Sequence, residues 1–110
     1  MLRVSRALGA LTLAAGLACA GGATAAGKAT THTIVIEAVQ YTPQALVVER
    51  GDTIVWVNKD PFPHTVTAKG AFDSHDIAAG KSWKYVARKA GEYAYICTLH
   101  PNMHGTLTVK

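Results

Sequence analysis

Three side chains that can bind metal recur at three-residue steps near the end of the chain, in Cys97-Thr98-Leu99-His100-Pro101-Asn102-Met103. A thiolate, an imidazole and a thioether are soft or borderline ligands, and together they favour copper over harder ions. A copper site with two histidines, one cysteine and a weak axial methionine needs a second imidazole. Pro63-His64-Thr65 offers one earlier in the chain. The sequence therefore predicts a copper site formed by His64, Cys97, His100 and Met103.

The first residues have the pattern of a secretory signal peptide. Arg3 and Arg6 form a short basic region, Leu8 to Ala18 is an uncharged apolar run, and a stretch of small residues follows. The apolar run is too short to span a bilayer comfortably. We therefore expect a signal peptide over residues 1–26 and a single exported domain over residues 27–110, without stable membrane insertion.

Cys19 lies within the expected signal peptide. Gly16, three places before it, matches a lipid-attachment signal poorly, so we expect Cys19 to be removed rather than lipidated. Cys97 is then the only cysteine of the exported domain. One cysteine cannot close an internal disulfide, and a free thiol outside the cytosol is exposed to oxidation. Metal ligation removes that hazard because it commits the thiolate.

The net charge of the chain does not indicate a strongly charged partner. The sequence has eleven Lys and Arg residues and seven Asp and Glu residues, a formal net charge of +4. Arg3 and Arg6 belong to the expected signal peptide, so the expected domain is less basic than the whole chain. No basic run with interleaved aromatic residues follows in the sequence. We therefore expect no nucleic-acid partner.

Short β-prone runs separated by Gly, Pro and Asp turns fill the expected domain. The strongest is Thr53–Asn58, which is rich in β-branched and aromatic residues. The other expected strands are 31–37, 45–49, 64–68, 82–86, 92–96 and 106–109, whereas 71–80 is expected to be a loop. We predict an all-β fold, a Greek-key β-sandwich of about seven to eight strands. A sandwich gathers loops from different strands at one end, where His64 and Cys97 can meet.

The ligand segment resembles the C-x-x-H-x-x-M loop of the cupredoxins, in the short form of amicyanin-like members. Asp52-Thr-Ile-Val-Trp-Val-Asn58 with Pro63-His64-Thr-Val resembles the segment that bears the family's first histidine ligand, and Gly91-Glu-Tyr-Ala-Tyr95 is similar to amicyanin-like and plastocyanin-like proteins. The resemblance implies a type 1 copper site with His64, Cys97 and His100 equatorial and Met103 axial.

The same resemblance implies one-electron transfer in the periplasm, with the electron passing through His100. We expect a monomer and a transient redox partner, for example a c-type cytochrome or a periplasmic dehydrogenase or oxidase.

Three features depart from the family pattern. Thr65 stands where many members carry an Asn whose side chain ties the two ligand loops, so the resemblance does not supply that tie here. Leu99 and Asn102 stand where amicyanins carry Pro and Phe, which predicts a smaller apolar docking surface. His75 and His104 are additional imidazoles, which we expect to be solvated surface residues.

Four other functions use some of the same residues. A copper chaperone or storage protein shares the compartment, but it usually has a more open Met- and His-rich site. A structural zinc site has no use for Met103, because zinc rarely binds a thioether. A Cys–His hydrolase needs a substrate cleft, which nothing in the sequence suggests, so we expect no enzyme activity. A dinuclear copper centre needs a second cysteine near Cys97.

Overall fold

The computed structural model describes residues 28–110, which form nine strands and, within that range, no helix. The strands are β1 (Thr31–Glu37), β2 (Gln40–Thr42), β3 (Ala45–Val48), β4 (Thr53–Asn58), β5 (Thr67–Ala68), β6 (Phe72–Asp73), β7 (Ser82–Val86), β8 (Gly91–Cys97) and β9 (His100–Val109). The expected signal peptide and Cys19 lie outside the described residues. Within residues 28–110 no helix long and apolar enough to cross a membrane is found.

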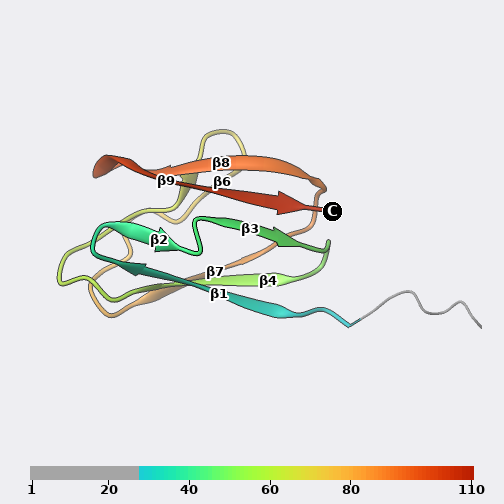
Figure 1. Cartoon of the computed structure of the whole chain (residues 1–110), viewed down its shortest axis with the longest axis horizontal. Coiled ribbons are helices and arrows are strands. Elements are labelled where there is room, and N and C mark those ends of the chain that lie inside the picture. The colour runs from blue at the N-terminus through green and yellow to red at the C-terminus, as the bar shows by residue number, and fades with distance from the viewer. Residues whose placement is uncertain (1–27) are drawn as a thin grey trace, which may run out of the picture.

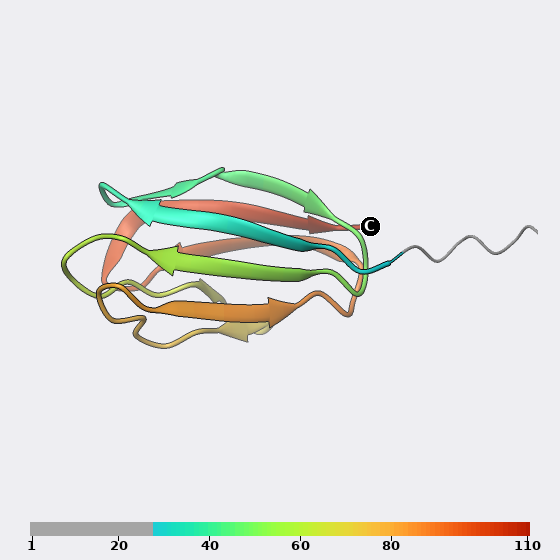
Figure 2. The same cartoon turned by 90° about the horizontal axis from the view of Figure 1, so that it is seen from below.

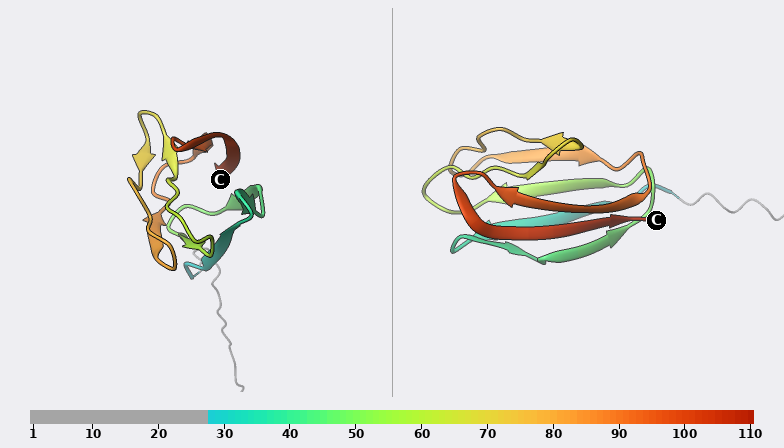
Figure 3. Two further views of the ribbon diagram at one scale, coloured as in Figure 1. Left: turned by 90° about the vertical axis from the view of Figure 1, so that its left-hand side faces the viewer. Right: turned by 90° about the horizontal axis from the view of Figure 1, so that it is seen from above.

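The strands form two sheets that face each other, so the predicted all-β sandwich is confirmed (Figure 1). One sheet has the order β2-β1-β4-β7, and it faces the viewer in Figure 2. The other has the order β3-β9-β8-β5-β6, and the end-on view of Figure 3 shows the two layers. Both sheets are mixed, because β1 runs parallel to β4 and β3 runs parallel to β9.

The alternation of side chains along each strand decides what fills the space between the sheets. In β4, Ile54 and Trp56 are completely buried, whereas Thr53, Val55 and Val57, which point the other way, are only half-buried. The Trp56 ring meets Tyr95 of the opposite sheet edge to face, and its Nε1 donates to the Tyr95 hydroxyl at 3.3 Å. Burying each large apolar side chain of this kind contributes about 1.5–3 kcal/mol. The core therefore joins the two sheets through aromatic contacts.

The structure has nine strands where about seven to eight were expected, and the differences concern short or local elements. Of the expected strand 64–68, only Thr67–Ala68 forms a strand, β5. The strands β2 and β6 have three and two residues, too few to show a period in the sequence, and β6 lies in the segment expected to be a loop. The last strand begins at His100 instead of residue 106, because His100 pairs with Cys97 across a tight turn. The predicted metal-binding segment is therefore itself part of a hairpin.

Candidate metal centre

The β8–β9 hairpin holds Cys97 and His100 opposite each other, with Thr98 and Leu99 forming the turn between them. His64 belongs to the segment after β4, and its backbone pairs with Ile77, with N···O distances of 3.1 and 2.7 Å. Both segments lie at the left-hand end of the sandwich in Figure 1. The fold therefore brings together residues that are 33 positions apart in the chain.

The three nitrogen and sulfur ligands predicted from the sequence form one compact group. Nδ1 of His64 and Nδ1 of His100 each lie 3.6 Å from Sγ of Cys97, and the three ligand atoms lie within 4.8 Å of one another. His64 and Cys97 are completely buried, whereas His100 is half-buried. Met103 is 3% exposed and lines the same surface hollow as His100.

This donor set fits copper. One buried sulfur faces two imidazole nitrogens, and a thioether side chain is buried beside the second imidazole. Soft sulfur with imidazole suits copper, whereas magnesium and calcium prefer oxygen ligands. The backbone N–H of Thr65 donates to Sγ of Cys97 at 3.2 Å, so the sulfur also has a hydrogen-bond donor inside the protein.

Comparison with known proteins identifies the family. Residues 9–109 match the family described as Cupredoxin-like domain. The chain belongs to this cupredoxin family. It is 31% identical to amicyanin of Paracoccus versutus over 81 residues, which cover 68% of this chain and 61% of that protein. It is also 31% identical to plastocyanin of Scenedesmus fuscus over 87 residues, which cover 66% of this chain and 89% of that protein.

Solved structures agree with this assignment. The Cu(I) form of one amicyanin mutant matches this cupredoxin with a TM-score of 0.68 and 29% identity, covering 80% of this chain and 88% of that one. The oxidised form of another amicyanin mutant also has a TM-score of 0.68, with 26% identity, covering 72% of this chain and 81% of that one. The chain nevertheless spans only 61% to 62% of the length of the two Paracoccus amicyanins it matches.

Thr65 ties the two ligand loops of this cupredoxin. Its Oγ1 accepts the N–H of Thr98 at 2.9 Å and lies 3.3 Å from the Thr98 hydroxyl. The same oxygen lies 3.0 Å from the Thr67 hydroxyl. A threonine hydroxyl thus makes a connection between the loops that the family resemblance alone did not supply at this position.

Asp60 lies behind His64 and was missed by the sequence reasoning. Its Oδ2 lies 2.7 Å from Nε2 of His64, and its backbone N–H donates to Oδ1 of Asn58 at 2.9 Å. The Asn58 side chain also donates to the carbonyls of Phe62 and Ile77, both at 2.9 Å. In the sequence, Asn58 and Asp60 come just before Pro61-Phe62-Pro63 and have the residue types that are common in turns. Their spacing gives no sign that they hold a histidine.

The charge of Asp60 follows from its partners. Burial works to raise the pKa of its carboxyl group. The N–H of Val39, the His64 ring and the N–H of Ala38 together outweigh burial and hold that pKa below its ordinary value. Asp60 is therefore a buried carboxylate.

Tyr41, in β2, supports the same loop from the other side. Its hydroxyl donates to the carbonyl of Thr65, the residue after His64. Burial raises the pKa of Tyr41 well above its ordinary value, and Cys97 and Tyr95 raise it further. The hydroxyl therefore keeps its proton and remains a donor to the loop.

An apolar surface surrounds the half-buried His100. Phe62 and Leu99 are 39% and 46% exposed, and Pro63 and Pro101 are also exposed. The centroid of the Phe62 ring lies 5.2 Å from that of His64 and 5.6 Å from that of His100. Met103 is almost fully buried and contributes to this surface only at the hollow that it lines with His100, Leu99 and Pro101.

The two additional histidines lie outside the ligand group. The His75 side chain is 85% exposed and stands beside Asp73. His104 is exposed, and its Nδ1 lies 3.3 Å from the Gln44 side-chain amide. Both are surface residues, as the sequence predicted.

Proposed function

We propose that this cupredoxin is an exported type 1 copper protein that carries single electrons between redox partners in the periplasm. The observation that carries the proposal is the compact group in which Nδ1 of His64 and Nδ1 of His100 each lie 3.6 Å from the buried Sγ of Cys97. These three residues would hold the copper, and Met103 would be the weaker fourth ligand, as the family resemblance implies. Amicyanin, to which the chain is similar, has been solved in a Cu(I) form.

The chain's own residues are suited to electron transfer. Bound copper would supply a one-electron Cu(I)/Cu(II) couple, which sites of this donor type use for electron transfer. His64 and Cys97 are completely buried, so the protein excludes water from that side of the group. The backbone N–H of Thr65 donates to the sulfur of Cys97 and holds it in place. The hydrogen bond between His64 and Asp60 holds the first imidazole. Ligands held in this way change little in position when an electron arrives.

His100 is the proposed exit for the electron, because it is the only imidazole of the group that is not fully buried. The apolar side chains of Phe62 and Leu99 beside it offer a small contact surface of the kind that transient redox complexes use. The partner we propose is a c-type cytochrome or a periplasmic dehydrogenase or oxidase. We propose that this protein meets it as a monomer. Residues 1–26 would direct export, and the protein would have no enzymatic activity of its own.

A visible absorption spectrum of the purified protein with one equivalent of Cu(II) tests the proposal. We expect an intense blue band that bleaches with a mild reductant and returns on oxidation. Cys97→Ser should remove the band, whereas the matched surface variant His104→Gln should retain it. A pale complex would contradict the proposal and favour a copper chaperone or storage protein, and a site that prefers zinc would contradict it equally.

A further inference from the structure

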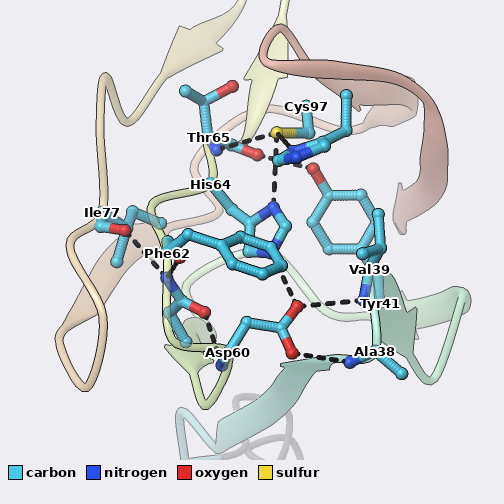
Figure 4. A network of polar contacts seen from close by, with 11 residues as sticks. Ala38, Val39, Tyr41, Asp60, Phe62, His64, Thr65, Ile77 and Cys97 are labelled. Carbon is cyan, nitrogen blue, oxygen red and sulfur yellow. Dashed lines mark hydrogen bonds and ion pairs between the residues drawn. The ribbon is translucent and has the colours of Figure 1, made fainter.

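A single buried carboxylate connects the proposed copper ligand His64 to the turn between β1 and β2 (Figure 4). Asp60 is 6% exposed, and its Oδ2 lies 2.7 Å from Nε2 of His64. Oδ2 also accepts the N–H of Val39 at 2.9 Å, and Oδ1 accepts the N–H of Ala38 at 2.7 Å. Every hydrogen-bonding group that meets the Asp60 carboxylate therefore belongs to the turn or to the imidazole.

The turn held by Asp60 has an unfavourable backbone conformation. Ala38 and Val39 have φ angles of 56° and 57°, in the left-handed region. This region is unfavourable for L-residues with a Cβ, and especially for a β-branched residue such as valine. The conformation points both backbone N–H groups at Asp60, so the carboxylate helps to hold the turn as well as the imidazole.

The contact with Asp60 also decides which nitrogen of His64 carries the proton. A carboxylate only accepts hydrogen bonds, so the nitrogen 2.7 Å away from it must be the donor, Nε2–H. A neutral imidazole has one N–H, which leaves the lone pair on Nδ1. That nitrogen faces Sγ of Cys97 at 3.6 Å, on the side where the metal would bind. The opposite tautomer would place two acceptors against each other at Asp60.

We infer that Asp60 is a positioning residue of the proposed copper centre, which fixes His64 as the Nε2–H tautomer and uses its negative charge to favour the oxidised metal. A negative charge behind a ligand in a buried site stabilises the more positive state of the metal, and outer partners of ligating histidines act in this way. Bound copper would exchange one electron with the redox partner, and the role of Asp60 requires no bond to be made or broken. This inference rests on the proposed function.

The first experiment needs neither copper nor a variant. Two-dimensional ¹H–¹⁵N NMR of the histidine rings in the copper-free protein, at mildly alkaline pH, reports the tautomer of each imidazole. We expect His64 to carry its proton on Nε2, in slow exchange with water. A His64 ring protonated on Nδ1 overturns the inference, and this result does not depend on whether copper binds.

The second experiment compares Asp60→Asn with a matched control, Asp52→Asn. Asp52 is the other buried aspartate that accepts two backbone N–H groups and contacts a histidine Nε2, and it lies far from the ligand group. We expect both variants to unfold at lower temperature. Only Asp60→Asn should raise the reduction potential of the copper-loaded protein, by at least about 59 mV, a tenfold shift of a one-electron couple toward the reduced form.

The outcomes separate this inference from the proposed function. An unchanged potential in a copper-loaded Asp60→Asn variant overturns the inference, as does an equal shift in Asp52→Asn. If Asp60→Asn does not fold, the NMR tautomer of the unsubstituted protein decides. If the unsubstituted protein gives no blue copper complex, the proposed function fails, while the tautomer result still tests the role of Asp60.

Discussion

Two buried aspartates at opposite ends of the sandwich have almost the same contacts. Asp60 accepts two backbone N–H groups and lies 2.7 Å from Nε2 of His64. Asp52 accepts the N–H groups of Thr30 at 2.9 Å and Glu49 at 3.0 Å, and it lies 2.9 Å from Nε2 of His32. Each carboxylate thus joins a turn to a histidine. The two ends differ in what surrounds that histidine and in the turn itself.

At the end of the sandwich that holds Asp52, called the far end below, the carboxylate joins a turn to a histidine that lies outside the ligand group. The His32 side chain is 25% exposed, and within residues 28–110 it belongs to no group of potential metal ligands. The turn before Asp52 uses Gly51 for its positive φ of 95°, whereas the turn at the ligand end uses Ala38 and Val39. Backbone strain held by surrounding contacts is typical of functional sites. The same kind of contact therefore joins a turn to an ordinary histidine at one end and to the proposed copper ligand His64 at the other.

The largest expected difference between the two ends is in copper binding. We expect His64→Gln to lose the blue band and to weaken copper binding by more than about 100-fold, since losing a ligand should cost more than losing an outer partner of one. His32→Gln should leave both unchanged. Titration with copper against a competing chelator, followed by visible absorption, measures the affinities. Equal losses in the two variants would remove the functional distinction between the ends.

Stability gives the next test, because at the ligand end the hydroxyl of Thr65 ties two loops. Thr65→Val removes the acceptor of the Thr98 N–H, a partly buried hydrogen bond at an exposed turn residue. We expect the free energy of unfolding of the copper-free protein to fall by about 0.5–1.5 kcal/mol, measured by urea denaturation. Thr67→Val keeps this acceptor and should cost less. An unchanged free energy of unfolding in Thr65→Val, or a larger loss in Thr67→Val, would contradict this prediction.

The sequence was sufficient to predict that His64, Cys97 and His100 lie together, because most of the information is local. Cys97 and His100 lie on one short hairpin, and only His64 had to be matched to them across the fold. The strands 31–37, 53–58 and 82–86 coincide with β1, β4 and β7, where β-branched and aromatic residues dominate. Such runs carry a strong local preference, which the packing of the two sheets then reinforces.

The supporting residues were not predictable in the same way. Asp60 meets the N–H groups of a turn 21 and 22 positions away, and backbone groups carry no sequence signal. The hydroxyl of Thr65 replaces an amide side chain that the family resemblance led us to look for, and only the three-dimensional path of the Thr98 backbone makes it a substitute. Residues that act through contacts with distant backbone have to be found in the structure.

Acid titration tests the far end by itself. The N–H groups of Thr30 and Glu49 and the His32 ring hold the pKa of Asp52 at about 2, below its ordinary value of 3.8, although burial opposes them. Because the folded pKa is lowered, the stabilisation by Asp52 is complete above 3.8 and is lost as the pH falls toward about 2. We expect the urea midpoint of the copper-free protein to fall over this range more steeply than that of Asp52→Asn. Parallel curves would contradict this.

The smallest effects should come from substitutions at the positive-φ residues of the two turns, where glycine replaces valine at one end and alanine replaces glycine at the other. Val39→Gly relieves a left-handed valine, and since glycine also gains freedom in the unfolded chain, we expect a net stabilisation below about 1 kcal/mol. Gly51→Ala, at a φ of 95° with nothing within 4 Å of the added Cβ, should destabilise the fold through its backbone alone. Thermal unfolding of the copper-free variants measures both effects.

Neither substitution should change the reduction potential of the copper-loaded protein. In Val39→Gly the N–H of residue 39 still donates to Asp60. A shifted potential in Val39→Gly would mean that the strain of the turn itself, and not only the Asp60 charge, reaches His64.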